Sequence, residues 1–589
     1  MSSSSEPIQL SETIRTLHEK LVALYGQKRG TVAHKRLMQM LEDFRTAYPD
    51  LAAASPVPSE RVTERDVMLI TYADTLQEPN VPPLRTLERF LRQRLAGTVS
   101  SVHILPFFPY SSDDGFAVLD YKAVNPSLGT WEDVRRIGQR FKLMFDAVIN
   151  HISAQSAWFR AYLEGDPAYR DFFITVDPST DLSSVVRPRD LPLLTPFQTR
   201  WGGEKYIWTT FSADQVDLNY ANPEVLLRIV DVLLFYVSQG MSFVRLDAIA
   251  YLWKEIGTGC IHLPQTHTVI KLFRDVLDFV APHVAIITET NVPHAENVSY
   301  FGDGTDEAQL VYQFTLPPLT LHAFATEDAT ILSEWAAGIA PPSDRATFLN
   351  FTASHDGIGV RPAEGILSEE QIQALVERAL AHGGAVSYKR NGDGSHSPYE
   401  LNINYFDALS DPQAAEPLAL QTRRFISSQA IQLAFVGMPG VYIHSLLGSR
   451  SWREGVKLSG HKRAINREKL SYAEVEAALE SDTLRRQVFR AYRALIAARV
   501  GQKAFHPNGP QTVLRLHRRV FALLRQSPQG DEQVLALHSV ANQPLTLNLG
   551  AVKLEGVRGW VDLLSEARFA ADDVLSLQPY QVLWLKAQH

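Results

Sequence analysis

The chain alternates short apolar runs with amphipathic stretches over most of its length. Stretches such as 84–95, 225–239 and 267–280 repeat apolar residues at helical spacing. This alternation predicts parallel strands with right-handed helical crossovers, and eight strands predict an α/β fold, a closed (β/α)8 TIM barrel. An open, doubly wound sheet is the alternative, but no glycine-rich turn follows the first strand. The runs with the length and composition of buried strands are 66–72, 101–108, 141–148, 242–246, 284–288, 308–314, 347–351 and 440–444.

Three parts of the chain depart from this alternation. Residues 1–65 repeat leucine and methionine at helical spacing, which predicts an N-terminal helical extension. Residues 152–221, between the third and fourth strands, are too long and too rich in proline, aspartate and aromatic residues for a loop. We therefore expect a small inserted domain over the barrel mouth there. Short alternating runs in 506–589 predict a C-terminal antiparallel β domain. The barrel is expected to comprise residues 66–151 and 222–505.

Two shorter segments have the composition of irregular structure. Small residues and prolines in 52–58 indicate a linker between the extension and the barrel. Residues 358–410 follow the seventh strand, and within them 391–397 combine glycine, aspartate and serine in a way typical of a mobile loop.

Composition narrows the class of protein. In 589 residues, 45 % are hydrophobic and 21 % are charged, as in an ordinary soluble globular protein. The net charge of −8, with both signs interspersed, argues against a nucleic-acid partner. The one cysteine, Cys260, excludes an internal disulfide and a thiolate metal cluster. There is no secretion-signal pattern, and no stretch approaches the roughly 20 apolar residues of a membrane span, so we expect a cytoplasmic protein without a membrane partner.

Two charged residues interrupt the apolar run 241–250. Arg245 and Asp247 are two residues apart, so their side chains point to the same side of an extended strand. Charged groups at the end of a buried strand are costly unless they are paired or used. Taken alone, the run fits a structural ion pair as well as it fits a catalytic carboxylate.

Polar residues follow several of the other predicted strands. The carboxyl ends of barrel strands line the active site, so these residues are expected to meet on one rim. Each acid alone could be a solvated loop residue, but three carboxylates and two His-containing motifs on one rim favour a catalytic site. They are Asp146, Asn150 and His151 after the third strand, Asp247 after the fourth, Glu289 after the fifth, and His355 and Asp356 after the seventh.

This set, in this order, resembles the four shared regions of the α-amylase-type glycoside hydrolase family. Residues 105–108, 114–116, 210–217, 354–359 and 465–467 look like the versions found in its sucrose phosphorylase branch. The resemblance covers about 66–510, and the N-terminal extension is similar to that of the longer members, which include glucosylglycerate phosphorylases. It implies a retaining reaction that uses two carboxylates and needs neither a cofactor nor a metal ion.

The resemblance also implies residue roles. Asp247 would be the nucleophile, kept ionised by Arg245, Glu289 the acid/base, and Asp356 the stabiliser of the transition state. The residues implied to hold the glucosyl unit are Asp114, Phe116, His151, Gln215, Arg245, His355 and Arg467. For the histidines, the alternative is a buried structural role.

A phosphorylase must also bind inorganic phosphate, which requires a basic pocket in this acidic chain. Arg189 and Tyr399 match family positions that contact phosphate, and Lys389 and Arg390 are further candidates. Lys462 and Arg463 fit a solvated surface better.

The expected partners are small molecules, an α-glucoside and phosphate, and a homodimer stays an open alternative. Glu400 stands where the sucrose-specific members have Gln beside the fructose, so we expect glucosylglycerate as the donor, with Lys389 or Arg390 facing the glycerate carboxylate. Sucrose or sucrose 6′-phosphate phosphorolysis, an amylosucrase-like hydrolase or transglucosidase, and a non-catalytic sugar binder are the alternatives.

Overall fold

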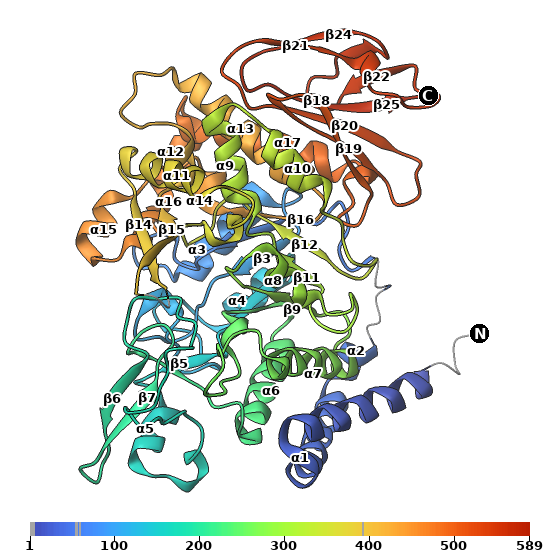
Figure 1. Cartoon of the computed structure of the whole chain (residues 1–589). Coiled ribbons are helices and arrows are strands. Elements are labelled where there is room, and N and C mark those ends of the chain that lie inside the picture. Colours follow the sequence, from blue (N-terminus) through green and yellow to red (C-terminus); the bar gives the residue numbers. More distant parts are fainter. Residues whose placement is uncertain (1–5, 54–56, 58–59, 392–393) are drawn as a thin grey trace.

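The computed structural model describes residues 6–53, 57, 60–391 and 394–589. At its centre is a closed barrel of eight parallel strands, as the sequence predicts, in which each strand pairs with its predecessor in the chain (Figure 1). The strands are β1 (Met68–Thr71), β3 (Ser101–Ile104), β4 (Lys142–Ala147), β9 (Met241–Leu246), β10 (Ala285–Thr288), β11 (Leu310–Tyr312), β12 (Thr347–Asn350) and β16 (Met438–Tyr442).

Helices follow most barrel strands and cover the barrel. Their inward faces pack on the outward side chains of the strands in one large apolar core, and the side chains inside the barrel form a second, smaller core. The strands are therefore buried on both faces. These helices are α3 (Pro83–Phe90), α4 (Trp131–Gly138), α6 (Pro223–Ser238), α7 (Pro264–Val280), α8 (His294–Val298), α9 (Leu316–Thr326), α10 (Thr330–Ala337), α11 (Glu369–Ala381), α12 (Tyr405–Leu409), α13 (Leu418–Ala434), α14 (Ile443–Leu446), α15 (Arg453–Ser459), α16 (Tyr472–Glu480) and α17 (Leu484–Val500).

The N-terminal extension is a helical hairpin packed on α6 and α7. α1 (Glu6–Ala47) is broken at Gly26, whose φ of 76° is open to glycine at little cost, and α2 (Pro49–Ala53) follows. Gly30 lets the two arms touch, since a Cβ there would lie 2.6 Å from the Leu21 carbonyl oxygen. Lys20 pairs with Asp275 of α7 at 2.5 Å. Residues 52 and 53 of the predicted linker are helical, and most of the remainder lies outside the described residues.

The segment between β4 and β9 forms two small antiparallel sheets and a helix at one end of the barrel (Figure 1). The β5–β8 sheet adjoins the barrel, and its register sets His151 opposite Asp217. The elements are β5 (His151–Ser153), α5 (Ala157–Glu164), β6 (Leu194–Gln198), β7 (Glu204–Trp208) and β8 (Gln215–Asp217).

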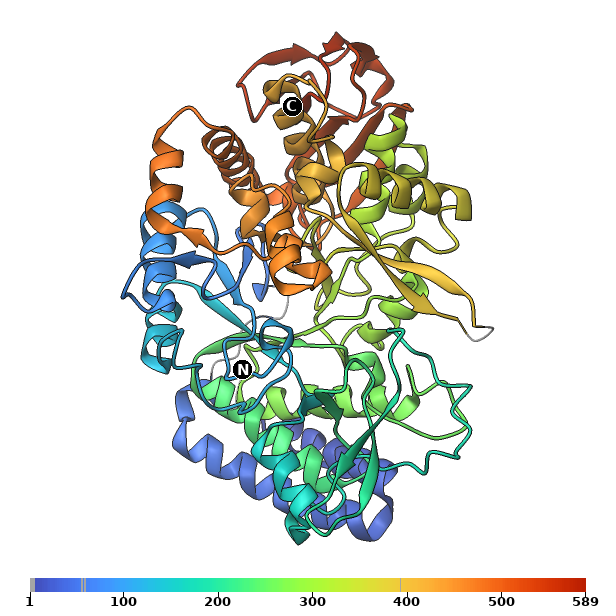
Figure 2. The same cartoon turned by 90° about the vertical axis from the view of Figure 1, so that its left-hand side faces the viewer.

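After the seventh barrel strand, the chain forms a β-hairpin that reaches toward the inserted segment (Figure 2). β14 (Ala385–Arg390) and β15 (His396–Asn402) pair with each other, and β13 (Ile358–Gly359) adds a third strand. Most of the expected loop 358–410 is therefore regular structure. At the hairpin end, His396 Nε2 lies 3.0 Å from Asp190 Oδ2 of the inserted segment.

The C-terminal residues form the expected antiparallel β structure. A six-stranded sheet contains β18 (Gln511–His517), β19 (Val520–Gln526), β20 (Gln533–Ser539), β25 (Val582–Gln588), β22 (Gly559–Asp562) and β23 (Arg568–Ala570) in that order, and β21 (Leu545–Asn548) pairs with β24 (Val574–Leu577). The sequence prediction omitted β22, β23 and β24, which are only three or four residues long. Among the described residues, no helix has the length and apolarity needed to cross a membrane.

Candidate active site

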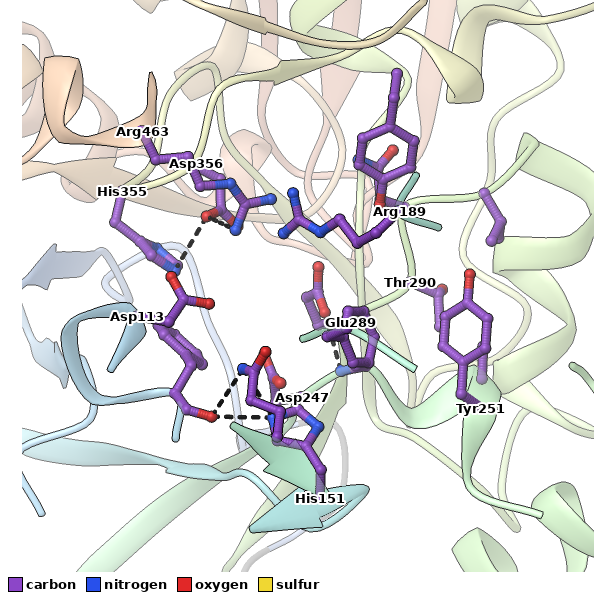
Figure 3. Close-up of a pocket in the computed structure, with 18 residues that line it drawn as sticks. Asp113, His151, Arg189, Asp247, Tyr251, Glu289, Thr290, His355, Asp356 and Arg463 are labelled. Atoms are coloured by element: carbon purple, nitrogen blue, oxygen red, sulfur yellow. Dashed lines mark hydrogen bonds and ion pairs between the residues drawn. The ribbon is translucent and has the colours of Figure 1, made fainter. Parts of the chain in front are cut away.

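A cavity opens at the carboxyl ends of the barrel strands, beside the inserted segment (Figure 3). Residues from nine separated stretches of the chain meet there, as expected for a barrel rim with an inserted segment. The lining comprises Asp113, Phe116, His151, Arg189, Phe211, Gln215, Asp247, Ala248, Ala250, Tyr251, Glu289, Thr290, Asn291, Val292, His355, Asp356, Tyr399 and Arg463.

Arg245 is the cation at the base of this cavity. The pairing of β4 with β9 places it beside Asp146, to which it is hydrogen-bonded, and His103 Nε2 lies 2.6 Å from the other oxygen of Asp146. Burial alone would raise the pKa of Asp146, but His103 and Arg245 lower it below its usual value. The same guanidinium lies 2.8 Å from Asp247 Oδ1 and 3.7 Å from Glu289 Oε2. One buried cation therefore serves three carboxylates.

The carboxyl groups of Asp247 and Glu289 have raised pKa values. Burial is the main cause for both, and Arg245 offsets part of it. The pKa of Asp247 is about 6, and that of Glu289 is about 7, where the Asp247 charge adds to the increase. The Ala248 backbone N–H donates to Glu289 Oε2 at 3.0 Å and fixes this carboxyl over β9. Two carboxyl groups with pKa values near neutrality in one cavity can exchange protons at physiological pH.

The pKa of Asp356 is shifted in the opposite direction to those of Asp247 and Glu289, because two arginines lie beside it. Arg463 Nη1 lies 2.5 Å and Arg467 Nη2 3.3 Å from its Oδ1. Burial would raise the pKa of Asp356, but Arg463, His355 and Arg467 together hold it well below the usual value. Asp356 is therefore a permanent anion beside two groups that titrate.

The predicted sugar-binding residues form an aromatic and amide wall of the cavity. Phe116 and His355 stack with ring centroids 5.0 Å apart. His151 Nε2 and Gln215 Nε2 lie 2.9 and 3.1 Å from the Phe116 carbonyl oxygen. Burial lowers the pKa of both His151 and His355, so both rings are neutral hydrogen-bonding groups.

Asp114 and Arg467 lie behind this wall. Arg467 donates to Asp114 Oδ2 at 2.7 Å and to the His355 carbonyl oxygen at 2.9 Å. It is the neighbouring Asp113, which the sequence analysis did not single out, whose side chain lines the cavity. Asp113, Asp114 and Gly115 all have positive φ, and a Cβ on Gly115 would lie 2.6 Å from the Pro106 carbonyl oxygen.

A buried ion pair fastens the inserted segment to the barrel next to His151. Lys254 Nζ lies 2.6 Å from Asp217 Oδ2 and 2.7 Å from Asn150 Oδ1. Thr210 also donates to both Asp217 oxygens, from its backbone N–H and its hydroxyl. The ammonium thereby joins residues of the third strand end, the inserted segment and the fourth strand end.

The structure places only two of the five residues predicted to bind phosphate or the acceptor in the cavity lining. Arg189 and Tyr399 line the cavity. Lys389 faces a different cavity and lies 3.3 Å from Glu364, and Arg390 is exposed at the end of β14. Glu400 is fully buried and does not line the active-site cavity.

The position of Arg463 differs from the sequence prediction, which assigned this residue to solvated surface. Its Nε and Nη2 lie 3.0 and 2.6 Å from the two oxygens of Glu400, and its remaining nitrogen contacts Asp356 in the cavity. The signal available in the sequence was Glu400 itself, because a carboxylate in a buried strand requires a cation. The neighbouring Lys462 turns away and donates to the Val386 carbonyl oxygen.

Comparisons with known proteins find related sequences and a related structure. A model of the α-amylase catalytic domain matches residues 96–339. A glucosylglycerate phosphorylase of Spirochaeta thermophila is 53 % identical over 535 residues, 90 % of each chain. The chain belongs to the phosphorylase branch of the α-amylase family. A second relative in this branch, the glucosylglycerate phosphorylase of Allomeiothermus silvanus, is 48 % identical over 575 residues, which are 98 % of this chain and 99 % of that protein.

A solved structure shares the fold. Sucrose 6F-phosphate phosphorylase from Thermoanaerobacter thermosaccharolyticum superposes with a TM-score of 0.71 at 24 % identity. The superposition covers 86 % of the chain described here and 98 % of the phosphorylase chain. Within the described part of the chain, no group of three or more His, Cys, Asp or Glu side chains is arranged to hold a metal ion.

Proposed function

We propose that this protein is a retaining glucosylglycerate phosphorylase. It transfers the glucosyl unit to inorganic phosphate and releases α-glucose 1-phosphate and glycerate. The observation that carries the proposal is the pair Asp247 and Glu289, buried on adjacent strand ends around one guanidinium, in a chain similar to glucosylglycerate phosphorylases over 90 % or more of its length.

In the first step, Asp247 attacks the anomeric carbon while Glu289 protonates the departing glycerate oxygen. The bond to glycerate breaks and a β-glucosyl ester with Asp247 forms. With a pKa of about 6, Asp247 is mainly ionised at neutral pH, and with a pKa of about 7, Glu289 is protonated in a large fraction of molecules. Asp356 stays anionic and stabilises the positive charge that develops on the sugar ring.

In the second step, a phosphate oxygen attacks the anomeric carbon from the opposite face and Asp247 leaves. Glu289, now ionised, accepts the proton of the incoming phosphate. Two inversions retain the α configuration. Arg189 and Tyr399 are proposed to hold the phosphate, and His151, His355, Phe116, Gln215 and Asp113 the glucosyl unit.

A phosphate-release assay tests the proposal. The protein is given α-glucose 1-phosphate with glycerate, fructose, fructose 6-phosphate, glycerol or water, and free phosphate is followed. We expect rapid release with glycerate and slow release with water. Release with fructose alone supports sucrose phosphorolysis instead, and equal release in water supports a hydrolase.

An inactive variant completes the test. Asp247→Asn keeps the shape of the side chain but cannot form the ester, and we expect a loss of at least about 10⁴-fold in phosphate release, as for other removed nucleophiles. A folded Asp247→Asn protein with substantial activity would contradict the assigned nucleophile.

A further inference from the structure

Two guanidinium groups face each other across the cavity. Arg189 comes from the inserted segment and Arg463 from the segment before α16, and their side chains point toward one another above Asp247 and Glu289 (Figure 3). Tyr399 lines the same cavity, and both arginines lower the pKa of its hydroxyl against the larger increase caused by burial. Like charges converging on one cavity repel each other unless an anion lies between them.

The two arginines differ in what holds them. No ion pair or hydrogen bond is found for Arg189 among the described residues, so its charge is available to a ligand. Arg463 is held from behind by the two oxygens of Glu400, which is 1 % exposed, and from one side by Asp356. A guanidinium fixed by a bidentate carboxylate loses little further side-chain entropy when it meets an anion.

We propose that Arg463, fixed by Glu400, recognises the carboxylate of the acceptor, and that this carboxylate and phosphate use the same space between Arg463 and Arg189 in alternate half-reactions. The inference rests on the proposed function. It moves recognition of the acceptor carboxylate from Lys389 or Arg390, where the sequence analysis expected it, to the arginine that Glu400 holds. Glu400 is a positioning residue, since it is buried and lies outside the cavity lining.

This arrangement explains how an acidic cavity accepts an anionic acceptor. Asp247, Glu289 and Asp356 all line the cavity, and each would repel a glycerate anion. Arg245 is already shared by Asp146, Asp247 and Glu289 at the base. Two further cations line the cavity above the catalytic pair: Arg463, which shares its charge with Glu400 and Asp356, and Arg189, for which the described residues provide no carboxylate partner. Together they can offset the repulsion.

The test compares two acceptors of nearly equal shape, glycerate and its neutral amide, glyceramide. The rate of phosphate release from α-glucose 1-phosphate gives kcat/KM for each. We expect the wild-type protein to prefer glycerate by at least about tenfold, the value of one charge-assisted hydrogen bond. Equal rates would overturn the inference while leaving the proposed function intact. Failure of glycerate to raise release above the rate in water would instead overturn the proposed function.

Variants then assign the preference to Arg463. In Arg463→Gln the ratio of kcat/KM for glycerate to that for glyceramide should fall toward one, and Arg463→Lys should restore part of it.

Arg463→Gln leaves Glu400 buried without a cation and so risks misfolding. The double variant Arg463→Gln with Glu400→Gln removes both charges together, and the same fall in the ratio is expected. Lys462→Gln is the matched control, since it removes a neighbouring charge outside the cavity and should keep the wild-type ratio. If both acceptors slow equally in the Arg463 variants, Arg463 acts only through Asp356 and the inference is wrong.

Discussion

Removing the ammonium of Lys254 tests how the inserted segment is held over the active site. Lys254 and Asp217 are both nearly inaccessible, with side chains 3 % and 0 % exposed, and their charged atoms lie 2.6 Å apart. Lys254→Met preserves the volume of the side chain but leaves Asp217 as a buried anion without a cation. Loss of one partner of such a pair typically costs about 3–5 kcal/mol.

The cost of Lys254→Met should lie at the lower end of that range, about 3 kcal/mol, because other donors remain. Thr210 supplies two hydrogen bonds to Asp217, and Asn150 Nδ2 supplies a third at 3.1 Å. The loss should appear locally, in the β5–β8 sheet that carries His151 and Gln215. A local change of about 3 kcal/mol lowers protection from amide exchange by roughly 100-fold.

Hydrogen–deuterium exchange of residues 151–153 and 215–217 is the direct assay, and exchange there should become faster in Lys254→Met. The KM for α-glucose 1-phosphate should rise in the same variant. Lys122→Met is the matched control, because the Lys122–Asp231 pair has the same 2.6 Å distance but is about half exposed. Exposed pairs contribute at most about 1 kcal/mol. Adding Asp217→Asn to Lys254→Met should restore most of the protection. If Lys254→Met behaves like the Lys122 control, or the double variant is no better than the single one, the argument from burial is wrong.

Two other predictions concern proton transfer and the N-terminal hairpin. Asp247 must be ionised and Glu289 protonated, so kcat/KM for the glucosyl donor should fall below a pH of about 6 and above about 7; a plateau that extends to pH 9 would contradict the acid role of Glu289. Gly30→Ala places a Cβ 2.6 Å from the Leu21 carbonyl oxygen, so the free energy of unfolding, measured by thermal denaturation, should fall by about 1–3 kcal/mol. Gly203→Ala, whose Cβ would have only a 3.5 Å contact, should leave it unchanged.

The barrel was predictable from the sequence because its strands are buried on both faces. Such strands are continuous apolar runs, and the polar residues that interrupt them, Arg245 and Asp247, mark the carboxyl end. The catalytic candidates could be named for the same reason, since strand ends are fixed by the strands themselves. Short strands such as β22 and β23 carry no comparable pattern, because only two residues of β22 and none of β23 are buried.

What the sequence could not predict depends on contacts between distant segments. Arg463 lies in a polar stretch typical of a surface helix end, and only the fold brings it to Glu400 and Asp356. Lys254 likewise has no local signal, because its partners belong to the inserted segment and the third strand end. The positions of Lys389, paired with Glu364, and of the exposed Arg390 follow from the hairpin geometry of β14 and β15, which the composition of the loop did not reveal.

The distribution of cations suggests why phosphate is used in preference to water. Burial raises the pKa of Glu289, and Arg245, which is divided among three carboxylates, offsets only part of that increase. Asp356, by contrast, has Arg463 and Arg467 beside it and remains ionised. An anion bound near Glu289 raises the pKa of that carboxyl further, because like charges disfavour its ionised form. Glu289 then becomes a stronger base at the moment when it must accept a proton from the acceptor, and water brings no such charge. On this reasoning, the acid limb of kcat at saturating phosphate should lie at higher pH than the acid limb of hydrolysis without phosphate, because Glu289 must be ionised to accept the proton, and coincident acid limbs would exclude the effect.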